Sequence, residues 1–267
     1  MEKVKQNEVE ENQDQNETLF PISEIFTNYQ GEGVYAGTLM TFIRFAGCNV
    51  GKPYPKEKYE VGFEQGKQHP SIPAELPIYT EKCTTYDGRE FACDTDYRVK
   101  QRLAYHEIVG CIPNGVKHVC ITGGEPFMHK FMPLFIERLA KLWQVHVETS
   151  GTKPVPDLNA WITLSPKQGV RYDAFANADE LKLLVDENFD PTKKISLENP
   201  FNDKPMEIEL WYLAQSVITY LQPINNEHTI CAENLKLCLK WQEKFPQFRV
   251  CLQLHKAIGA IIGRIER

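Results

Sequence analysis

Three short segments with apolar interiors, in the middle of the chain, each run directly into small polar residues. The pairs are Lys117 to Thr122 with Gly-Gly-Glu-Pro, Gln144 to Glu148 with Thr-Ser-Gly-Thr, and Ala160 to Leu164 with Ser-Pro-Lys. Apolar strands that alternate with helical segments favour a parallel sheet, and the carboxyl ends of such strands meet at one rim. We therefore expect an α/β fold with a mostly parallel sheet and a functional site at that rim.

Other segments extend this series. Strand patterns cover Ile22 to Tyr29, Thr41 to Gly47, Glu180 to Asp186, Val217 to Gln222 and Phe248 to Leu254, and helical spacing covers Leu103 to Ile112, Phe131 to Trp143 and Thr229 to Phe245. Asn188 to Pro205 has little pattern. We expect Leu142 to face the core from the second helix, and we interpret His255 as a surface or capping histidine.

Domain organisation follows from composition along the chain. Residues 1–17 are polar with almost nothing to bury, which predicts a disordered leader. Residues 18–267 are expected to form a single domain, since 42% hydrophobic residues are enough to fill one core. Within it, residues 49–82 read as an insertion, because most of them show neither helix nor strand periodicity.

Charge and hydropathy exclude some classes of protein. A formal net charge of −6 provides no basic field for a nucleic-acid backbone. No apolar run approaches the length of a membrane span, and the first residues are polar where a signal peptide would be apolar. We therefore expect a cytoplasmic protein with no membrane or direct nucleic-acid partner.

The chain has eight cysteines, and in a reducing cytosol these are thiols or metal ligands rather than disulfides. Cys48 follows the strand Thr41 to Gly47, and Cys83 and Cys93 come later with the spacing C-x34-C-x9-C. That spacing alone does not identify a cluster, and one or more of these thiols could be simply packed or exposed. Cys111 and Cys120 are alternative metal ligands only by count. Cys111 is expected in a helix and Cys120 in the middle of a strand, and both are poor places for a loop-borne ligand.

Two glycine motifs point to close contact with a ligand. Gln30-Gly31-Glu32-Gly33 follows the first expected strand, and Gly123-Gly124-Glu125-Pro126 follows another. Glycine lets the backbone approach a ligand closely, although a plain hairpin turn and a common glycine turn are the alternatives.

Taken in order, the motifs resemble one family of enzymes. They are QGEG, RFAGCN, CDT, TGGEP, ETSGT, SPK and LQP, which occur between Gln30 and Pro223 in a resemblance that covers roughly Ile22 to Leu254. This order resembles the 7-carboxy-7-deazaguanine synthase family, which are radical S-adenosylmethionine enzymes of queuosine and deazapurine biosynthesis. The resemblance implies an incomplete (βα) barrel of the radical S-adenosylmethionine type. The chain departs from the usual C-x3-C-x2-C spacing, which we interpret as an expanded cluster loop.

The resemblance also implies cofactors and their ligands. Cys48, Cys83 and Cys93 would bind a 4Fe-4S cluster and leave one iron open for S-adenosylmethionine. Thr95 corresponds to the family's Mg²⁺ ligand. The residues expected to contact S-adenosylmethionine are Gly124, Ser165, Pro166, Lys167 and Gln222.

The substrate implied is the pterin 6-carboxy-5,6,7,8-tetrahydropterin, which a carbon-nitrogen lyase of this kind converts to 7-carboxy-7-deazaguanine with loss of ammonia. Arg44 suits a bidentate clamp on its carboxylate, with a surface arginine as the alternative. The rest of the expected pocket is Gln30, Gly31, Glu32 and Thr122. A reductant such as flavodoxin and a homodimer are implied as partners.

Two other functions stay open at this point. A different radical S-adenosylmethionine enzyme, such as a glycyl-radical activase, would share the three cysteines and the GGEP turn but has no reason to keep QGEG and CDT. A zinc-binding structural module would need a closed set of four ligands.

Overall fold

The sheet is built from strands whose apolar residues are buried on both faces, as in β2 (Leu39–Phe45) and β9 (Glu180–Val185). The computed structural model describes residues 18–51, 80–93, 95, 99–197, 204–225 and 229–262. The predicted leader, 1–17, and most of the predicted insertion, 52–79, lie outside the described residues.

Nine strands form the main sheet of the described chain. Their order across it is β13 (Phe248–Val250), β12 (Ile218–Pro223), β9, β8 (Trp161–Leu164), β7 (Gln144–Thr149), β6 (His118–Gly123), β2, β1 (Phe20–Tyr29) and β5 (Gln101–Leu103). Within this sheet, the neighbouring strands β2, β6, β7, β8, β9, β12 and β13 are all parallel, whereas β1 is antiparallel to both β2 and β5. The prediction of a mostly parallel α/β sheet is confirmed.

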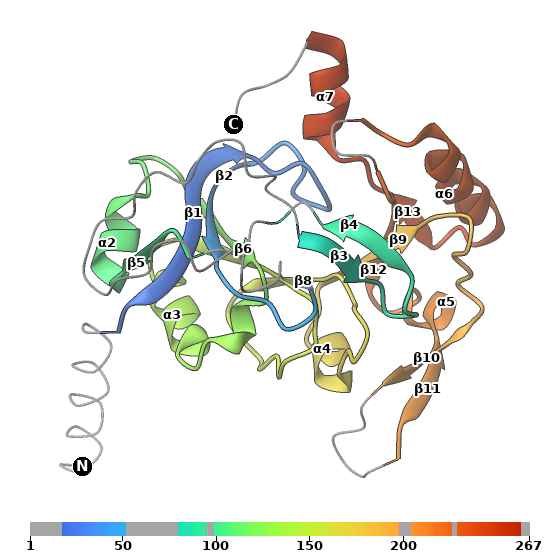
Figure 1. Ribbon diagram of the computed structural model, residues 1–267, viewed down its shortest axis with the longest axis horizontal. Helices are drawn as coiled ribbons and strands as arrows, with labels where there is room; N and C mark the ends of the chain where they lie inside the picture. Colours follow the sequence, from blue (N-terminus) through green and yellow to red (C-terminus); the bar gives the residue numbers. More distant parts are fainter. Residues whose placement is uncertain are drawn as a thin grey trace.

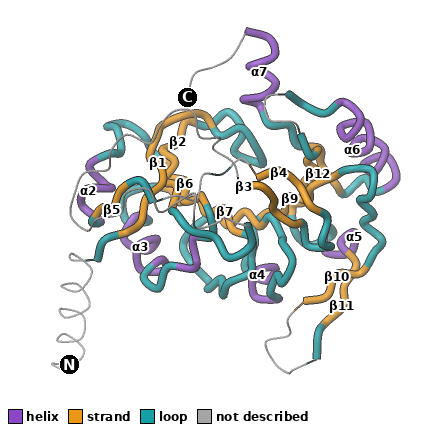
Figure 2. The backbone as a smooth tube through the Cα atoms, viewed as in Figure 1, coloured by secondary structure: helices purple, strands orange, loops and turns teal. Residues whose placement is uncertain are grey.

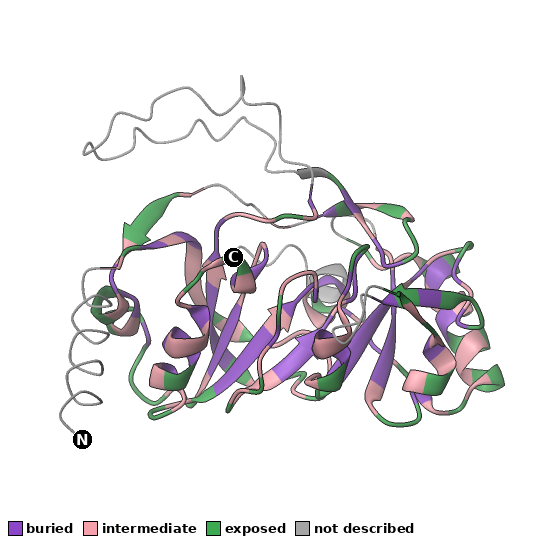
Figure 3. Ribbon diagram, turned by 90° about the horizontal axis from the view of Figure 1, so that it is seen from below, coloured by how far each residue is buried: buried purple, intermediate pink, exposed green. Residues whose placement is uncertain are grey.

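Helices surround the strands, as Figure 1 shows. They are α2 (Tyr105–Gly110), the 3-10 turn η2 (Pro126–Met128), α3 (Met132–Leu139), α4 (Tyr172–Ala176), α5 (Leu210–Leu213), α6 (Ala232–Lys244) and α7 (Leu254–Ile262). Buried residues follow the strands through the centre of the molecule (Figure 3). None of the described helices is long and apolar enough to cross a membrane.

Helix α3 shows how the core is formed. Met132, Phe135, Ile136 and Leu139 recur at helical spacing and are all buried. The helix ends earlier than predicted, so that Leu142 lies beyond it and is 68% exposed. The prediction that Leu142 faces the core is wrong, because the helical spacing no longer applies after Leu139.

Two hairpins were not predicted. β3 (Thr80–Thr84) and β4 (Glu90–Cys93) form one. β10 (Lys194–Leu197) and β11 (Met206–Glu209) form the other, in which β10 lies within the stretch of little pattern, 188–205, and β11 directly follows it. Both are two-stranded sheets separate from the main sheet. Figure 2 shows β10 and β11 standing clear of it beside α5.

The loop between β1 and β2 bridges the two ends of the open sheet. The Gly33 amide donates to Cys251 Sγ at 3.3 Å, just after β13, and the Val34 amide donates to Glu180 Oε2 at 3.0 Å. The Leu254 amide in turn donates to the Gly31 carbonyl oxygen at 3.0 Å. The QGEG segment is therefore no plain hairpin turn, because it begins a longer loop that reaches the strands at the far end.

Candidate active site

A cavity of about 490 Å³ opens where the parallel strands end. Almost every residue that the sequence singled out lines it, namely Gln30, Gly31, Glu32, Arg44, Cys48, Cys83, Cys93, Thr95, Thr122, Gly124, Ser165, Lys167 and Gln222. Pro166 is buried but is not part of the lining. His255, interpreted from the sequence as a surface or capping residue, lines the cavity too.

The three predicted cluster cysteines come from two different structures. Cys48 follows the end of β2, and the amides of Val50 and Gly51 donate to its sulfur at 3.4 and 3.5 Å. Cys83 and Cys93 are buried on the β3/β4 hairpin. A hydrogen bond between these two thiols, together with burial, raises the pKa of Cys83.

The positions of Cys48, Cys83 and Cys93 indicate which kind of metal centre they could form. Among the described residues, no group of three or more His, Cys, Asp or Glu side chains is placed to hold a metal ion. A structural zinc site needs four ligands around one ion, whereas an iron-sulfur cluster takes one thiolate for each iron. Three thiols around one cavity thus fit a cluster better than they fit zinc.

The Gly-Gly-Glu-Pro turn brings the end of β6 against the end of β2. The Gly124 amide donates to the Phe45 carbonyl oxygen at 3.0 Å, and the Glu125 amide donates to that of Gly47 at 3.0 Å. A Cβ on Gly124 would overlap the Gly47 carbonyl oxygen and touch the Cys48 side chain. Glycine is required here because two backbones meet beside a thiol.

We expect Gly124→Ala to lower the free energy of unfolding by about 3 kcal/mol, because the added methyl group meets rigid backbone. Urea denaturation measures this. Gly110→Ala is the matched control, since nothing lies within 4 Å of a Cβ there and Gly110 ends helix α2. Equal stability of the two variants would contradict the close approach at Gly124.

Glu125 ties this turn to the next strand. Its buried carboxylate accepts hydrogen bonds from the Phe127 amide at 3.1 Å, from Thr149 Oγ1 at 2.8 Å and from the Ser150 amide at 2.8 Å. The Ser150 hydroxyl donates to it as well. A buried carboxylate with this many donors fixes the ends of β6 and β7 relative to each other.

A chain of buried charges crosses the other side of the cavity. Lys182 of β9 donates to Glu32, and its Nζ lies 3.4 Å from Glu148 Oε1. Gln253 Nε2 donates to Glu32 Oε1 at 2.8 Å. Burial alone would raise the pKa of Glu32, but the charge and hydrogen bond of Lys182, with the help of Gln253, lower it to about 2. Glu32 is thus ionised at neutral pH.

Glu148 gathers two of the predicted substrate residues. Thr122 Oγ1 donates to its Oε2 at 2.8 Å, and Gln30 Nε2 donates to its Oε1 at 3.3 Å. No site role was predicted for three residues of this network, Lys182, Gln253 and Glu148, although Glu148 begins the ETSGT motif. A lysine between leucines in the otherwise apolar segment Leu181 to Val185 was a signal, because buried lysines need partners.

Lys167 lies beside the thiols. Its Nζ donates to Ser165 Oγ at 2.7 Å and to the Ser165 carbonyl oxygen at 3.1 Å, and it sits 5.3 Å from the centre of the Phe91 ring. Burial lowers the pKa of Lys167, an effect that the nearby Cys83 and Cys93 oppose. A buried cation next to these thiols favours their thiolate forms.

Arg44 and Gln222, which both line the cavity, each carry a buried polar atom with no hydrogen-bond partner in the described chain. Arg44 Nε and Gln222 Oε1 make no hydrogen bond among the described residues, although Arg44 lies 3.8 Å from a Glu24 carboxylate oxygen. One is a donor and the other an acceptor, and unsatisfied buried polar groups are rare in folded proteins. Both therefore suit a polar ligand in this cavity.

Known proteins are similar to this chain over nearly its whole length. A 7-carboxy-7-deazaguanine synthase from Synechocystis is 30% identical over 244 residues, covering 90% of this chain and 93% of the relative. One from Bacteroides thetaiotaomicron is 27% identical, covering 89% and 96%. The crystal structure of QueE from Escherichia coli superposes with a TM-score of 0.57 at 25% identity, covering 90% of this chain and 96% of that one. No family model matches the chain.

The fold and the site together define an α/β enzyme of the radical S-adenosylmethionine type, with three thiols around one cavity and a glycine turn at the carboxyl ends of parallel strands. The chain belongs to the 7-carboxy-7-deazaguanine synthase family, as its identity and coverage with these relatives show.

Proposed function

We propose that this member of the family converts 6-carboxy-5,6,7,8-tetrahydropterin to 7-carboxy-7-deazaguanine with loss of ammonia. The observation that carries the proposal is the convergence of three thiols, an arginine and an ionised glutamate on one cavity. A pterin with a carboxylate needs such a cation and such an acceptor. An activase of the same superfamily acts on a protein and has no use for a pocket of this polarity.

We propose that Cys48, Cys83 and Cys93 hold a 4Fe-4S cluster. Gly124, Ser165, Pro166, Lys167 and Gln222 would contact S-adenosylmethionine. When bound, the cluster supplies the electron that cleaves S-adenosylmethionine and so starts radical chemistry on the substrate. The chain's own part is to place the Lys167 cation beside the thiols, where its charge opposes the raised pKa of Cys83, and to present backbone at Gly124, where no side chain fits.

Recognition of the substrate falls to the other side of the cavity. Arg44 supplies a cation with an unsatisfied buried Nε, which suits the substrate carboxylate. Glu32, ionised and therefore only an acceptor, suits the amino and ring N–H groups of a pterin. Gln30, Gly31 and Thr122 complete the lining.

A metal ion, a reductant and a second subunit complete the proposed enzyme. Thr95, which lines the same cavity, would ligate Mg²⁺ together with substrate oxygens and water. A reductant such as flavodoxin would supply electrons, the enzyme would act as a homodimer, and it would work in the cytoplasm.

Product formation tests the function directly. The enzyme is reconstituted anaerobically with iron and sulfide and incubated with the pterin, S-adenosylmethionine, magnesium and a reductant. We expect 7-carboxy-7-deazaguanine by mass spectrometry, and we expect less of it when magnesium is chelated. Deoxyadenosine without that product would retain the radical enzyme class and overturn the substrate.

Arg44→Ala should raise the KM for the pterin at least about tenfold, because a charge-assisted contact to a carboxylate contributes roughly 1.5–3 kcal/mol. Initial rates at varied substrate measure it. Arg44→Lys keeps the positive charge but loses the two parallel N–H donors of the guanidinium, so an intermediate KM is expected. An unchanged KM in Arg44→Ala would reject the clamp.

A further inference from the structure

We propose that Arg89 is a positioning residue for the iron-sulfur centre, because it fastens the hairpin that carries Cys83 and Cys93 to the end of strand β9. Arg89 follows the turn between β3 and β4 and is not itself part of the cavity lining. The inference rests on the proposed cluster for its function, but the fastening itself is a property of the chain.

Arg89 makes contacts in two directions. Its Nε donates to both carboxylate oxygens of Asp87 at 2.9 Å, within the hairpin turn. Its Nη1 donates to Asp186 Oδ1 at 2.6 Å and its Nη2 donates to the Leu184 carbonyl oxygen at 2.9 Å, both at the end of β9. The guanidinium also lies 5.5 Å from the centre of the Phe189 ring. A planar group with this many donors suits such a junction.

The junction is largely shielded from water. The side chains of Arg89, Asp87 and Asp186 are 11%, 17% and 15% exposed. Nearby, the ring of Tyr86 is buried in the main hydrophobic core. Removing one member of a shielded charge group leaves the others without compensation, so this clamp should matter far more than a surface ion pair.

The hairpin needs such a clamp because it forms its own two-stranded sheet. β3 and β4 pair with each other and with no strand of the main sheet among the described residues. An isolated two-stranded hairpin is marginally stable in water. Cys48, in contrast, directly follows β2 of the main sheet. The distance between the first thiol and the other two therefore depends on how the hairpin is fastened.

Thiol alkylation in the full-length, iron-free protein tests the fastening without any cluster. In Arg89→Ala, iodoacetamide should modify Cys83 and Cys93 at least about tenfold faster than in the wild type, a ratio that corresponds to about 1.4 kcal/mol. Both thiols are buried, so their reaction reports opening of the hairpin. Mass spectrometry of peptides gives the rate for each cysteine.

Two other cysteines distinguish local from global effects. Cys238 is a fully buried residue of helix α6 and should react as slowly as in the wild type, and the exposed Cys111 should react at the same rate in every variant. Unchanged rates at Cys83 and Cys93 would overturn the proposal. So would a parallel rise at Cys238, because Arg89 would then support the whole fold rather than the hairpin.

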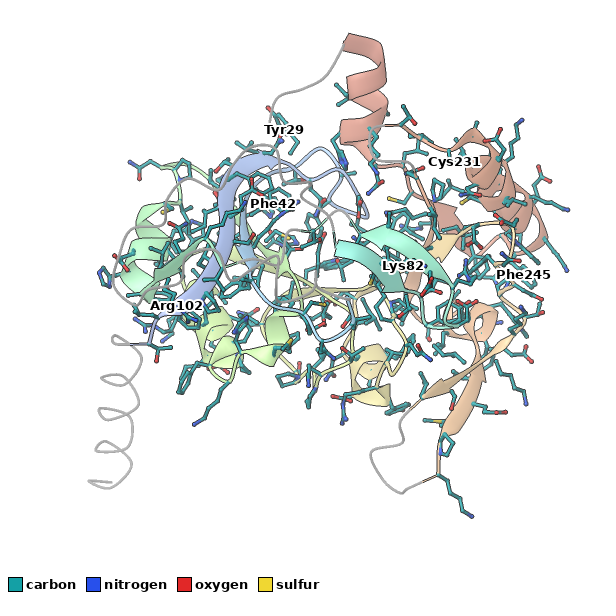
Figure 4. All side chains as sticks on the ribbon, in the orientation of Figure 1. Tyr29, Phe42, Lys82, Arg102, Cys231 and Phe245 are labelled. Carbon is teal, nitrogen blue, oxygen red and sulfur yellow. The ribbon has the colours of Figure 1, made fainter. Side chains whose placement is uncertain are left out.

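The control variant is Lys82→Ala. Lys82 lies on the same hairpin, where it is labelled in Figure 4, and pairs with Glu90 of the facing strand at 2.6 Å. That pair is half-exposed and internal to the hairpin, with side chains 56% and 43% exposed. It should leave the alkylation rates within about twofold of the wild type, as expected for a surface pair.

Asp186→Asn and Arg89→Lys keep the proposal testable if Arg89→Ala fails to fold. Each retains the size of the group but removes part of the junction, so the rates at Cys83 and Cys93 should lie between those of wild type and Arg89→Ala. After anaerobic reconstitution, iron per chain and the electron paramagnetic resonance spectrum of the reduced centre should change in Arg89→Ala, be partly restored in Arg89→Lys and be unaltered in Lys82→Ala. If the wild type bound no cluster, the proposed function would fail while the alkylation rates would still decide the fastening.

Discussion

Cys83→Ala protein, reconstituted anaerobically with iron and sulfide, is expected to lose its 4Fe-4S cluster. In the proposed cluster each of the three thiolates would hold one iron, and among the described residues no other cysteine lines the cavity to replace Cys83. Loss of an outer-shell partner already lowers metal affinity roughly 10–100-fold, so loss of a ligand should exceed that. Iron and sulfide per chain, together with the brown colour of the sample, measure the result.

Cys111→Ala serves as the control for this substitution. Cys111 is exposed and caps helix α2, away from the cavity lining, so that variant should bind iron as the wild type does. Full iron content in Cys83→Ala would show that the middle ligand is another residue. Comparing the iron content of these two variants tests the middle ligand, which is the ligand that the unusual spacing C-x34-C-x9-C puts in question.

Most of the main sheet could be predicted because its strands are buried on both faces. Segments such as Lys117 to Thr122 have an apolar centre, here Val-Cys-Ile, and end at a glycine turn, and they appear in the structure as strands such as β6. The β3/β4 hairpin gave no such signal. Thr-Glu-Lys-Cys-Thr is polar and pairs with a single neighbour, so neither burial nor alternation marks it as a strand.

The candidate site could be located from sequence because its motifs follow strands that end at one rim. The charge network could not, because it depends on a loop that crosses to distant strands. Glu32 and Lys182 are 150 residues apart, and they meet only because the loop after β1 reaches β9. Sequence patterns report local periodicity and burial, and they do not report which buried lysine meets which carboxylate.

Lys182→Met is expected to lower the free energy of unfolding at pH 7 by about 3–5 kcal/mol, as removal of one partner of a buried ion pair does. Lys182 is 8% exposed and faces Glu32 and Glu148, which are 14% and 25% exposed. Without the cation, two carboxylates would remain close together in a shielded place. Urea denaturation of iron-free protein measures the change.

Lys194→Met is the control, since Lys194 and Glu207 form a pair 3.5 Å apart with side chains 60% and 59% exposed. A change of no more than about 1 kcal/mol is expected there. The double variant Lys182→Met with Glu32→Gln should recover roughly 1–3 kcal/mol, because the uncompensated charge is removed. Equal stability of Lys182→Met and the wild type would show that the buried pair is not coupled to folding.

The ion pair of Glu32 and Lys182 should also change how the stability of the fold depends on pH. In the wild type the pKa of Glu32 is lowered from 4.5 to about 2, so its contribution is present above the unfolded value and is lost as the pH falls between these values. In Lys182→Met the largest remaining influence is burial, which raises the pKa of Glu32. When a carboxyl group has a higher pKa in the folded than in the unfolded protein, the folded protein becomes more stable as the pH falls. Acidification from pH 7 to 5 should therefore stabilise Lys182→Met relative to the wild type, and a difference in stability that does not change with pH would mean that Glu32 does not depend on Lys182 for its charge.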